Sequence, residues 1–349
     1  MSLVMTCILV IVILSFLVSN ILLAAYAKSD LGGSCGSVPD NRQYALNRIT
    51  GNVTVIDTDT NSVTGHIDLP NNGELVGLAL AHDGSKLYVS GGSNGRVFVI
   101  DTRTNRVIDT ISVGISPHEI VVSPDDRRAY VLNTGNHTVN ESISVIDTST
   151  DSVVASLGPD DYSPSGIVIS PDSSRAYVSS YDSDVRVLDT GTFKELDTLP
   201  ATGYLVAISP DGKLLYIFTE GKNGFFGNLA TIDILNKQLV SNLDVGFFPA
   251  SALSPEGKRL YLTGNRSQYN NSVTVIDTIN NVITTKITLN DSPSITARAW
   301  AFDIKISPDG KTVYVANLID DYIRVIDAET CTEKARIPAG YGHSGLAIS

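Results

Sequence analysis

Apolar and polar residues alternate in short runs along most of the chain. In the run 142–147, Ser-Ile-Ser-Val-Ile-Asp, apolar side chains occupy alternate positions before the run ends on an aspartate. A period of two predicts a β-strand with one buried face. One order of elements recurs: an apolar strand, a Ser-Pro-Asp-Gly turn, a strand containing tyrosine, a loop, a strand ending in Val-Ile-Asp-Thr, a short turn and a fourth strand. The pattern therefore predicts a repeated unit of four strands.

Landmark residues give the number of units. The turns between first and second strands fall at positions 82, 124, 171, 210, 255 and 308, at intervals of 39 to 53 residues. The second strand of each copy contains one tyrosine: Tyr44, Tyr88, Tyr130, Tyr177, Tyr216, Tyr261 and Tyr314. The third strand of each copy ends on one aspartate: Asp57, Asp101, Asp147, Asp189, Asp233, Asp277 and Asp327. Units of this length and strand content are typical of propeller blades. We therefore expect an all-β fold, a seven-bladed β-propeller with four-stranded antiparallel blades, over residues 37–349.

The two ends of the repeat region complement each other. The first copy begins near Pro39 with a turn and a second strand, and it lacks a first strand. The chain ends at residues 345–349, Gly-Leu-Ala-Ile-Ser, a first strand without its turn. We expect this C-terminal segment to supply the innermost strand of the blade that the N-terminal copy begins, because closure of the ring removes exposed sheet edges.

The repeated motifs resemble those of a known family. Tyr-Val-Leu-Asn at 130–133 and Tyr-Val-Ala-Asn at 314–317, with the Ser-Pro-Asp-Gly and Val-Ile-Asp-Thr elements, are similar to the motifs of the YVTN-repeat β-propeller family. That family includes archaeal surface-layer-like proteins and bacterial exported propellers. The resemblance implies the propeller fold and a binding or cell-surface role. Related propellers include lactonases and an antibiotic lyase, but none of their catalytic motifs matches this sequence residue by residue.

The N-terminal segment predicts export. The first 27 residues contain no charged side chain, residues 7–18 are almost entirely apolar, and Ala-Tyr-Ala stands at 25–27. This order is typical of a secretory signal that is cleaved after the small residues. The segment is also long enough to be an uncleaved membrane anchor. Both interpretations place residues 37–349 outside the cytoplasm, as a secreted, periplasmic or cell-surface domain behind a short linker at 28–36. Contact with a membrane is expected only if the segment is retained.

Beyond the export segment the chain contains two cysteines, Cys35 and Cys331. The sequence has neither a Cys-x-x-Cys-His motif for haem attachment nor Cys and His residues at zinc-binding spacing. In an oxidising compartment two such cysteines are most simply a disulfide. We therefore expect Cys35 and Cys331 to pair, and we expect no metal or other cofactor.

The acidity of the chain follows largely from its turns. The formal charge is −12, which argues against a nucleic-acid partner because phosphate binding needs clustered basic residues. The strand-ending aspartates and the acidic residues of the first turns make fourteen carboxylates; the latter are Asp40, Asp83, Asp125, Asp172, Asp211, Glu256 and Asp309. The remaining 23 acidic residues nearly balance the 25 basic ones. The segment 57–61, Asp-Thr-Asp-Thr-Asn, superficially resembles a calcium loop, but its recurrence without further ligands favours an Asx-type turn.

The predicted topology separates two faces. The first-to-second and third-to-fourth turns, with the fourteen carboxylates, lie on one face, here the lower face. The opposite, upper face carries the second-to-third loops and the connections between blades, and their lengths vary, with long segments at 133–142, 219–228, 263–272 and 290–300. Variable loops on a rigid scaffold usually carry binding. We therefore expect function on the upper face.

An alignment of the first strands predicts which side chains line the central channel. One set of alternate positions is apolar, and the other is mostly glycine or alanine except at Glu119, Asp303 and Lys305. We expect these three side chains to point into the channel. Around its upper mouth we expect His118, Tyr204, Arg298, Trp300, Phe302, Tyr341 and His343.

These residues support two interpretations. In a small-molecule site, Glu119 or Asp303 would be a carboxylate ligand or base, and Trp300 would be a stacking wall. A proton carrier would come from His118 or His343. In the other interpretation, water fills the channel, a lysine balances the nearby acids and the histidines are surface residues. We favour a non-enzymatic binding or cell-surface protein whose partner is a small molecule, a glycan or a protein. The alternatives are a lyase or hydrolase at the channel mouth and a structural surface-layer component.

Overall fold

The computed structural model describes residues 41–70, 75–91, 95–136, 141–158, 163–220, 226–246, 250–265, 270–289, 301–317, 321–340 and 342–349. Within these ranges the regular secondary structure consists of β-strands. No helix of the described residues is long and apolar enough to cross a membrane. The predicted export segment, the linker and Cys35 lie outside the described residues, and so does the start of the first copy near Pro39.

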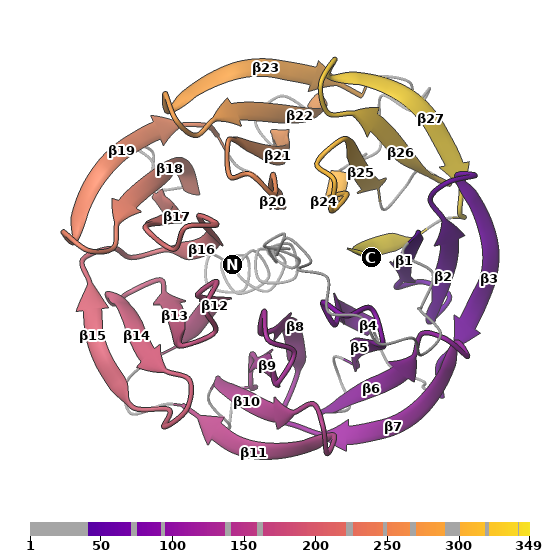
Figure 1. Cartoon of the computed structure of the whole chain (residues 1–349), viewed down its shortest axis with the longest axis horizontal. Coiled ribbons are helices and arrows are strands. Elements are labelled where there is room, and N and C mark those ends of the chain that lie inside the picture. The colour runs from indigo at the N-terminus through magenta and orange to yellow at the C-terminus, as the bar shows by residue number, and fades with distance from the viewer. Residues whose placement is uncertain are drawn as a thin grey trace, which may run out of the picture.

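Seven four-stranded antiparallel sheets surround a central axis like the blades of a propeller (Figure 1). The innermost strands, from blade 1 to blade 7, are β28 (His343–Ile348), β4 (Leu75–Leu80), β8 (Pro117–Val122), β12 (Pro164–Ile169), β16 (Tyr204–Ile208), β20 (Ser251–Leu253) and β24 (Ala301–Ile306). The second strands are β1 (Arg42–Asn47), β5 (Lys86–Gly91), β9 (Arg128–Asn133), β13 (Arg175–Ser180), β17 (Leu214–Glu220), β21 (Arg259–Asn265) and β25 (Thr312–Asn317).

The third strands are β2 (Asn52–Asp57), β6 (Arg96–Asp101), β10 (Ser142–Asp147), β14 (Val185–Asp189), β18 (Phe226–Asp233), β22 (Asn270–Asp277) and β26 (Tyr322–Asp327). The outer strands are β3 (Ser62–Asp68), β7 (Arg106–Ser112), β11 (Ser152–Leu157), β15 (Glu195–Leu199), β19 (Gln238–Asp244), β23 (Val282–Thr288) and β27 (Thr332–Pro338). The all-β, seven-bladed fold predicted from the landmarks is thus confirmed.

The ring closes between the two ends of the repeat region. The C-terminal strand β28 pairs antiparallel with β1, with Tyr44 opposite Ala347 and Ala45 opposite Leu346. Blade 1 therefore has the strand order β28-β1-β2-β3, in which the last strand of the sequence is nearest the axis. This confirms the closure predicted from the incomplete first and last copies.

The hydrophobic core lies between the blades. The described residues form seven apolar clusters, and each cluster joins two neighbouring blades. The second-strand tyrosines are at most 3% exposed. A blade in the ring therefore buries both faces of its inner three strands, whereas most residues of each outer strand are exposed. Burial on two sides explains why the second and third strands are almost continuously apolar.

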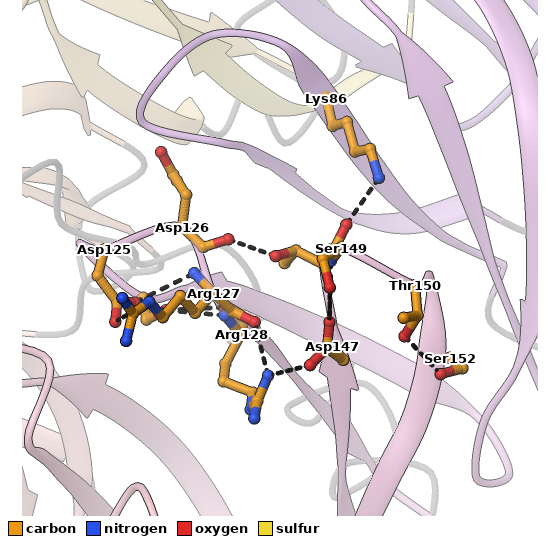
Figure 2. Close-up of polar contacts among 11 residues, drawn as sticks. Lys86, Asp125, Asp126, Arg127, Arg128, Asp147, Ser149, Thr150 and Ser152 are labelled. Atoms are coloured by element: carbon orange, nitrogen blue, oxygen red, sulfur yellow. Dashed lines mark hydrogen bonds and ion pairs between the residues drawn. The ribbon is translucent and has the colours of Figure 1, made fainter.

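The strand-ending aspartates form the expected Asx-type turns. The Asp57 carboxylate accepts a hydrogen bond from the Thr60 backbone N–H at 2.8 Å, and Asp101 accepts one from Thr104 at 2.7 Å. Hydrogen bonds from the Thr60 backbone and hydroxyl hold the pKa of Asp57 below its usual value. In blade 3 the carboxylate of Asp147 is also contacted by Arg128 (Figure 2). These bonds support the interpretation of the repeated acids as structural turn residues.

The lower-face turns also touch from blade to blade. A Cβ atom added to Gly257 would lie 2.5 Å from Cδ of Pro210 in the preceding blade. Blade 3 has Asp126 at the equivalent position, and its carboxylate accepts hydrogen bonds from the backbone N–H groups of His82 and Asp83 in blade 2 at 2.6 and 2.8 Å. Lys86 of blade 2 similarly reaches the Asp151 carboxylate of blade 3 at 2.7 Å. Figure 2 shows Lys86 and Asp126 at this junction.

These turn contacts predict different costs for two glycine substitutions. Gly257 and Gly51 have φ values of 72° and 71°, but a Cβ at Gly51 would meet no atom within 4 Å. Gly51→Ala should lower the free energy of unfolding by about 1 kcal/mol through backbone strain. Gly257→Ala should cost a further 1 to 3 kcal/mol, roughly, because its methyl group overpacks against Pro210. Urea unfolding of the two variants measures the difference. Equal midpoints would contradict the close contact between the turns of neighbouring blades.

Candidate functional site

The candidate site is built by first strands from three blades. Glu119 lies on β8 of blade 3, Tyr204 begins β16 of blade 5, and Asp303 and Lys305 lie on β24 of blade 7. These strands are arranged around the central axis in Figure 1. All four side chains are buried: Glu119 is 2%, Tyr204 1%, Asp303 0% and Lys305 9% exposed. The polar residues are therefore enclosed by the ring and do not stand in open solvent.

Asp303 links blade 7 to the closing strand. One carboxylate oxygen accepts a hydrogen bond from the Leu346 backbone N–H on β28 at 2.6 Å. The other accepts one from the Ile304 N–H at 2.8 Å and lies 3.4 Å from Nζ of Lys305. Burial raises the pKa of Asp303 to about 6, although Lys305 and the two backbone donors oppose the rise. Since its oxygens are already occupied, Asp303 serves as a structural clamp at the point of ring closure.

Glu119 has a different environment. The Tyr204 hydroxyl donates to its Oε2 over 3.4 Å, while its Oε1 is buried and has no hydrogen-bond partner among the described residues. Burial raises its pKa to about 8, against the opposing effects of Tyr204 and of the Lys305 charge. The carboxyl group is therefore mostly protonated at neutral pH. A buried polar atom without a partner is costly, so such an atom marks a position where a ligand group would be stabilised.

Tyr181, which the sequence did not single out, joins this group. It follows β13 directly and is 36% exposed. Burial of its phenol and the nearby Glu119 carboxyl both raise its pKa. Burial likewise raises the pKa of Tyr204 well above its usual value, with Glu119, Tyr181 and Asp303 adding to the rise. Four blades thus contribute to one polar cluster, which we call the axial cluster: Glu119, Tyr181, Tyr204, Asp303 and Lys305.

The two candidate histidines are placed differently from the carboxyl groups. His343 is fully buried on β28, and its Nε2 lies 2.8 Å from the Ala339 carbonyl oxygen. Burial lowers its pKa, so the neutral form is favoured. His343 is therefore not a surface residue, contrary to one of the two interpretations, and its role as a proton carrier stays a prediction. His118 is half-buried on β8, and its carbonyl oxygen accepts a hydrogen bond from the Ser90 hydroxyl of blade 2 at 3.2 Å.

Several predicted residues fall outside the description. Arg298, Trp300 and Tyr341 lie outside the described residues, as does the Phe302 side chain. The expected disulfide between Cys35 and Cys331 stays a prediction, because Cys35 lies outside the described residues. Cys331 itself is half-buried in the turn between β26 and β27, where burial raises the pKa of its thiol. Within the described ranges, no three His, Cys, Asp or Glu side chains are grouped as metal ligands would be.

Comparisons of sequence agree with the fold. No model of a known protein family matches the chain. The chain is similar to the seven-bladed β-propeller protein Rv1057 of Mycobacterium tuberculosis, with 31% identity over 129 residues, or 35% of this chain and 32% of that protein. It is also similar to the uncharacterized protein YwhL of Bacillus subtilis, with 28% identity over 331 residues, or 89% of this chain and 65% of that protein. Each match thus spans less than two thirds of the relative.

Solved structures show the same architecture. The hydrazine synthase of Kuenenia stuttgartiensis superposes with a TM-score of 0.69 and 24% identity, over 84% of this chain and 94% of that chain. The dihydro-heme d1 dehydrogenase NirN gives 0.65 and 16%, over 89% and 75%. A protein of unknown function from Desulfotomaculum acetoxidans gives 0.68 and 15%, over 88% and 98%. At these identities the likeness concerns the fold alone. The chain is a seven-bladed β-propeller, and its narrower resemblance to YVTN-repeat proteins stays a prediction.

Burial of Glu119 predicts a pH-dependent stability. Between its ordinary pKa of 4.5 and its folded value of about 8, the folded protein retains a proton that the unfolded chain releases. This group therefore lowers the free energy of unfolding as the pH rises through that window, by at most about 1.4 kcal/mol per pH unit. Glu119→Gln should remove this contribution, so its stability should fall less than that of the wild type between pH 5 and pH 8.

Urea unfolding at several pH values measures this difference. The matched control is Glu329→Gln, at an exposed turn residue of the lower face, which should follow the wild-type pH dependence. Parallel pH profiles for the wild type and Glu119→Gln would show that Glu119 is ionised in the folded protein.

Proposed function

We propose that this protein is an exported, non-enzymatic binding β-propeller that recognises its ligand at the axial cluster and the adjoining upper loops. The buried Oε1 of Glu119, without a partner among the described residues, is the observation that carries the proposal. Most first strands place small or apolar side chains at the corresponding position, such as Gly77, Gly166 and Gly345. The Glu119 side chain is only 2% exposed, and burial of a carboxyl group costs free energy unless its oxygens are hydrogen-bonded. A binding role would explain why the carboxyl group is present at this position.

Export is supported by the sequence of the first 27 residues, which have no charged side chain and end in Ala-Tyr-Ala. In this proposal the propeller acts outside the cytoplasm, as a secreted, periplasmic or cell-surface domain. Its partner is a small molecule, or the small terminal group of a glycan or protein, because Tyr181 is the partly exposed member of an otherwise buried cluster.

The alternative function is a lyase or hydrolase at the same place. One observation favours it: a carboxyl group with a pKa of about 8 is suited to transferring protons near neutral pH. Catalysis by the residues first considered would need a second group beside Glu119. Asp303 is engaged with Leu346, Ile304 and Lys305, and His343 is bonded to Ala339. Binding therefore has the stronger support.

A ligand screen tests the proposal. Monosaccharides, amino acids, carboxylates and amines are added singly to the wild type, to Glu119→Gln and to Glu329→Gln, and the Tm of each mixture is measured. At least one compound should raise the Tm of the wild type and of Glu329→Gln by several degrees, and should raise that of Glu119→Gln much less. A screen without such a compound would contradict the proposal, and consumption of a bound compound, followed by NMR, would favour the enzyme.

A further inference from the structure

The unpaired oxygen of Glu119 restricts the chemistry of a ligand. Tyr204 donates to Oε2, and Oε1 has no partner among the described residues, so the carboxyl group can accept one further hydrogen bond. Burial of the uncompensated negative charge is costly, and Glu119 therefore keeps its proton while the site is empty. A donor that also carries positive charge would stabilise the ionised carboxylate more strongly than a neutral donor, because it adds Coulomb attraction to the hydrogen bond.

The charges in the axial cluster lead to the same conclusion. Lys305 and Asp303 lie 3.4 Å apart and compensate each other. The phenols of Tyr181 and Tyr204 are neutral near pH 7, because the ordinary pKa of a tyrosine is already 10.0 and burial raises the pKa of both. With Glu119 protonated the cluster is therefore neutral, and with Glu119 ionised it carries one net negative charge. A single cation beside Glu119 would restore neutrality, but an anion would have to pair with a lysine that Asp303 already holds.

The aromatic residues suit a nitrogen cation. Tyr204 donates to Glu119 directly, and Tyr181 is close enough for the Glu119 charge to affect its pKa. A carboxylate combined with tyrosine side chains is a common environment for ammonium groups, which donate N–H hydrogen bonds to the carboxylate and are attracted to the faces of the rings. Three or more His, Cys, Asp or Glu groups, as a bound metal ion would use, are not gathered within the described ranges.

We propose that the axial cluster binds a primary ammonium group, with Glu119 as its carboxylate partner and Tyr204 and Tyr181 beside it. The inference rests on the proposed binding function and adds the class of ligand: a small amine or an amine terminus. The ammonium group donates to Oε1 of Glu119, and the carboxyl proton leaves to solvent as the cation enters. Binding of the cation and loss of one proton are therefore coupled.

Three probes with the same propyl chain test the charge requirement: propylammonium, 1-propanol and butanoate, with sodium chloride added to equalise ionic strength. Binding is followed by ligand-observed NMR and by Tm. Propylammonium should bind the wild type and Glu329→Gln saturably, and 1-propanol and butanoate should bind at least about tenfold more weakly. Glu119→Gln, which keeps the shape of the side chain and loses the charge, should weaken propylammonium binding by at least about tenfold.

The pH dependence supplies a second measurement. Because the Glu119 proton competes with the cation, the apparent Kd of propylammonium should fall by about fiftyfold between pH 6 and pH 8 for a carboxyl pKa of about 8. Among the described residues, the other members of the axial cluster that titrate or carry charge are Asp303, Lys305, Tyr181 and Tyr204. Asp303, with a pKa of about 6, would change the Kd by no more than about twofold over this range. Glu119→Gln should retain only that smaller dependence.

The outcomes separate the inference from the proposed function. If the compounds that depend on Glu119 in the screen are neutral or anionic, the ammonium inference is wrong and the binding function stands. If propylammonium binds with a Kd that is independent of pH, or binds Glu119→Gln equally well, the cation lies elsewhere and the inference fails. If no compound in either experiment depends on Glu119, both are contradicted.

Discussion

The pairing of β28 with β1 is the interaction on which the rest of the structure depends. Without it, blade 1 would lack its inner strand, and two neighbouring interfaces would lose the side chains that β28 contributes, among them Leu346 and Ala347. Every core cluster is shared by two blades, so an open ring would expose apolar surface on both sides of the break. Asp303 of blade 7 also holds β28, since its carboxylate accepts a hydrogen bond from the Leu346 backbone N–H. The closure thus fixes the strands that face the axis.

The same geometry explains why the inner strands combine small residues with a few charged ones. A Cβ at Gly77 would lie 2.1 Å from the His118 carbonyl oxygen of the next blade, and one at Gly166 would lie 3.2 Å from the Leu205 backbone nitrogen. A side chain at this position of the inner strand therefore points toward the inner strand of the next blade. Asp303 is short and meets the backbone of that blade. Glu119 is one methylene group longer, and its Oε2 lies 3.4 Å from the hydroxyl of Tyr204, two blades further along the ring. Its Oε1 has no partner among the described residues, whereas both oxygens of Asp303 are bonded.

The sequence predicted the fold nearly completely because the fold is periodic. One tyrosine, one aspartate and one turn per unit are local signals, and seven copies reinforce one another. The pattern of alternate residues also identified Glu119, Asp303 and Lys305 as exceptions on the inner strands. Tyr204 was expected at the channel mouth, but the pairings depend on the closed ring and were not visible in the pattern: Tyr204 is 85 residues from Glu119, and Leu346 is 43 residues from Asp303. Tyr181 does not belong to a repeated motif, so the pattern did not identify it. The burial of His343 arises from packing between blades, which the pattern within one repeat does not show.

Native-state hydrogen exchange of β28 tests the closure most directly. This strand pairs with β1 in blade 1 and contributes to both interfaces beside it. We expect the β28 amides bonded to β1 to exchange with the same opening free energy as the β1 and β2 amides, through global unfolding. If β28 exchanges through a local opening while β1 and β2 stay protected, the strand is a loosely attached tail. The closed ring, the Asp303 clamp and the arrangement of the axial cluster would then be contradicted together.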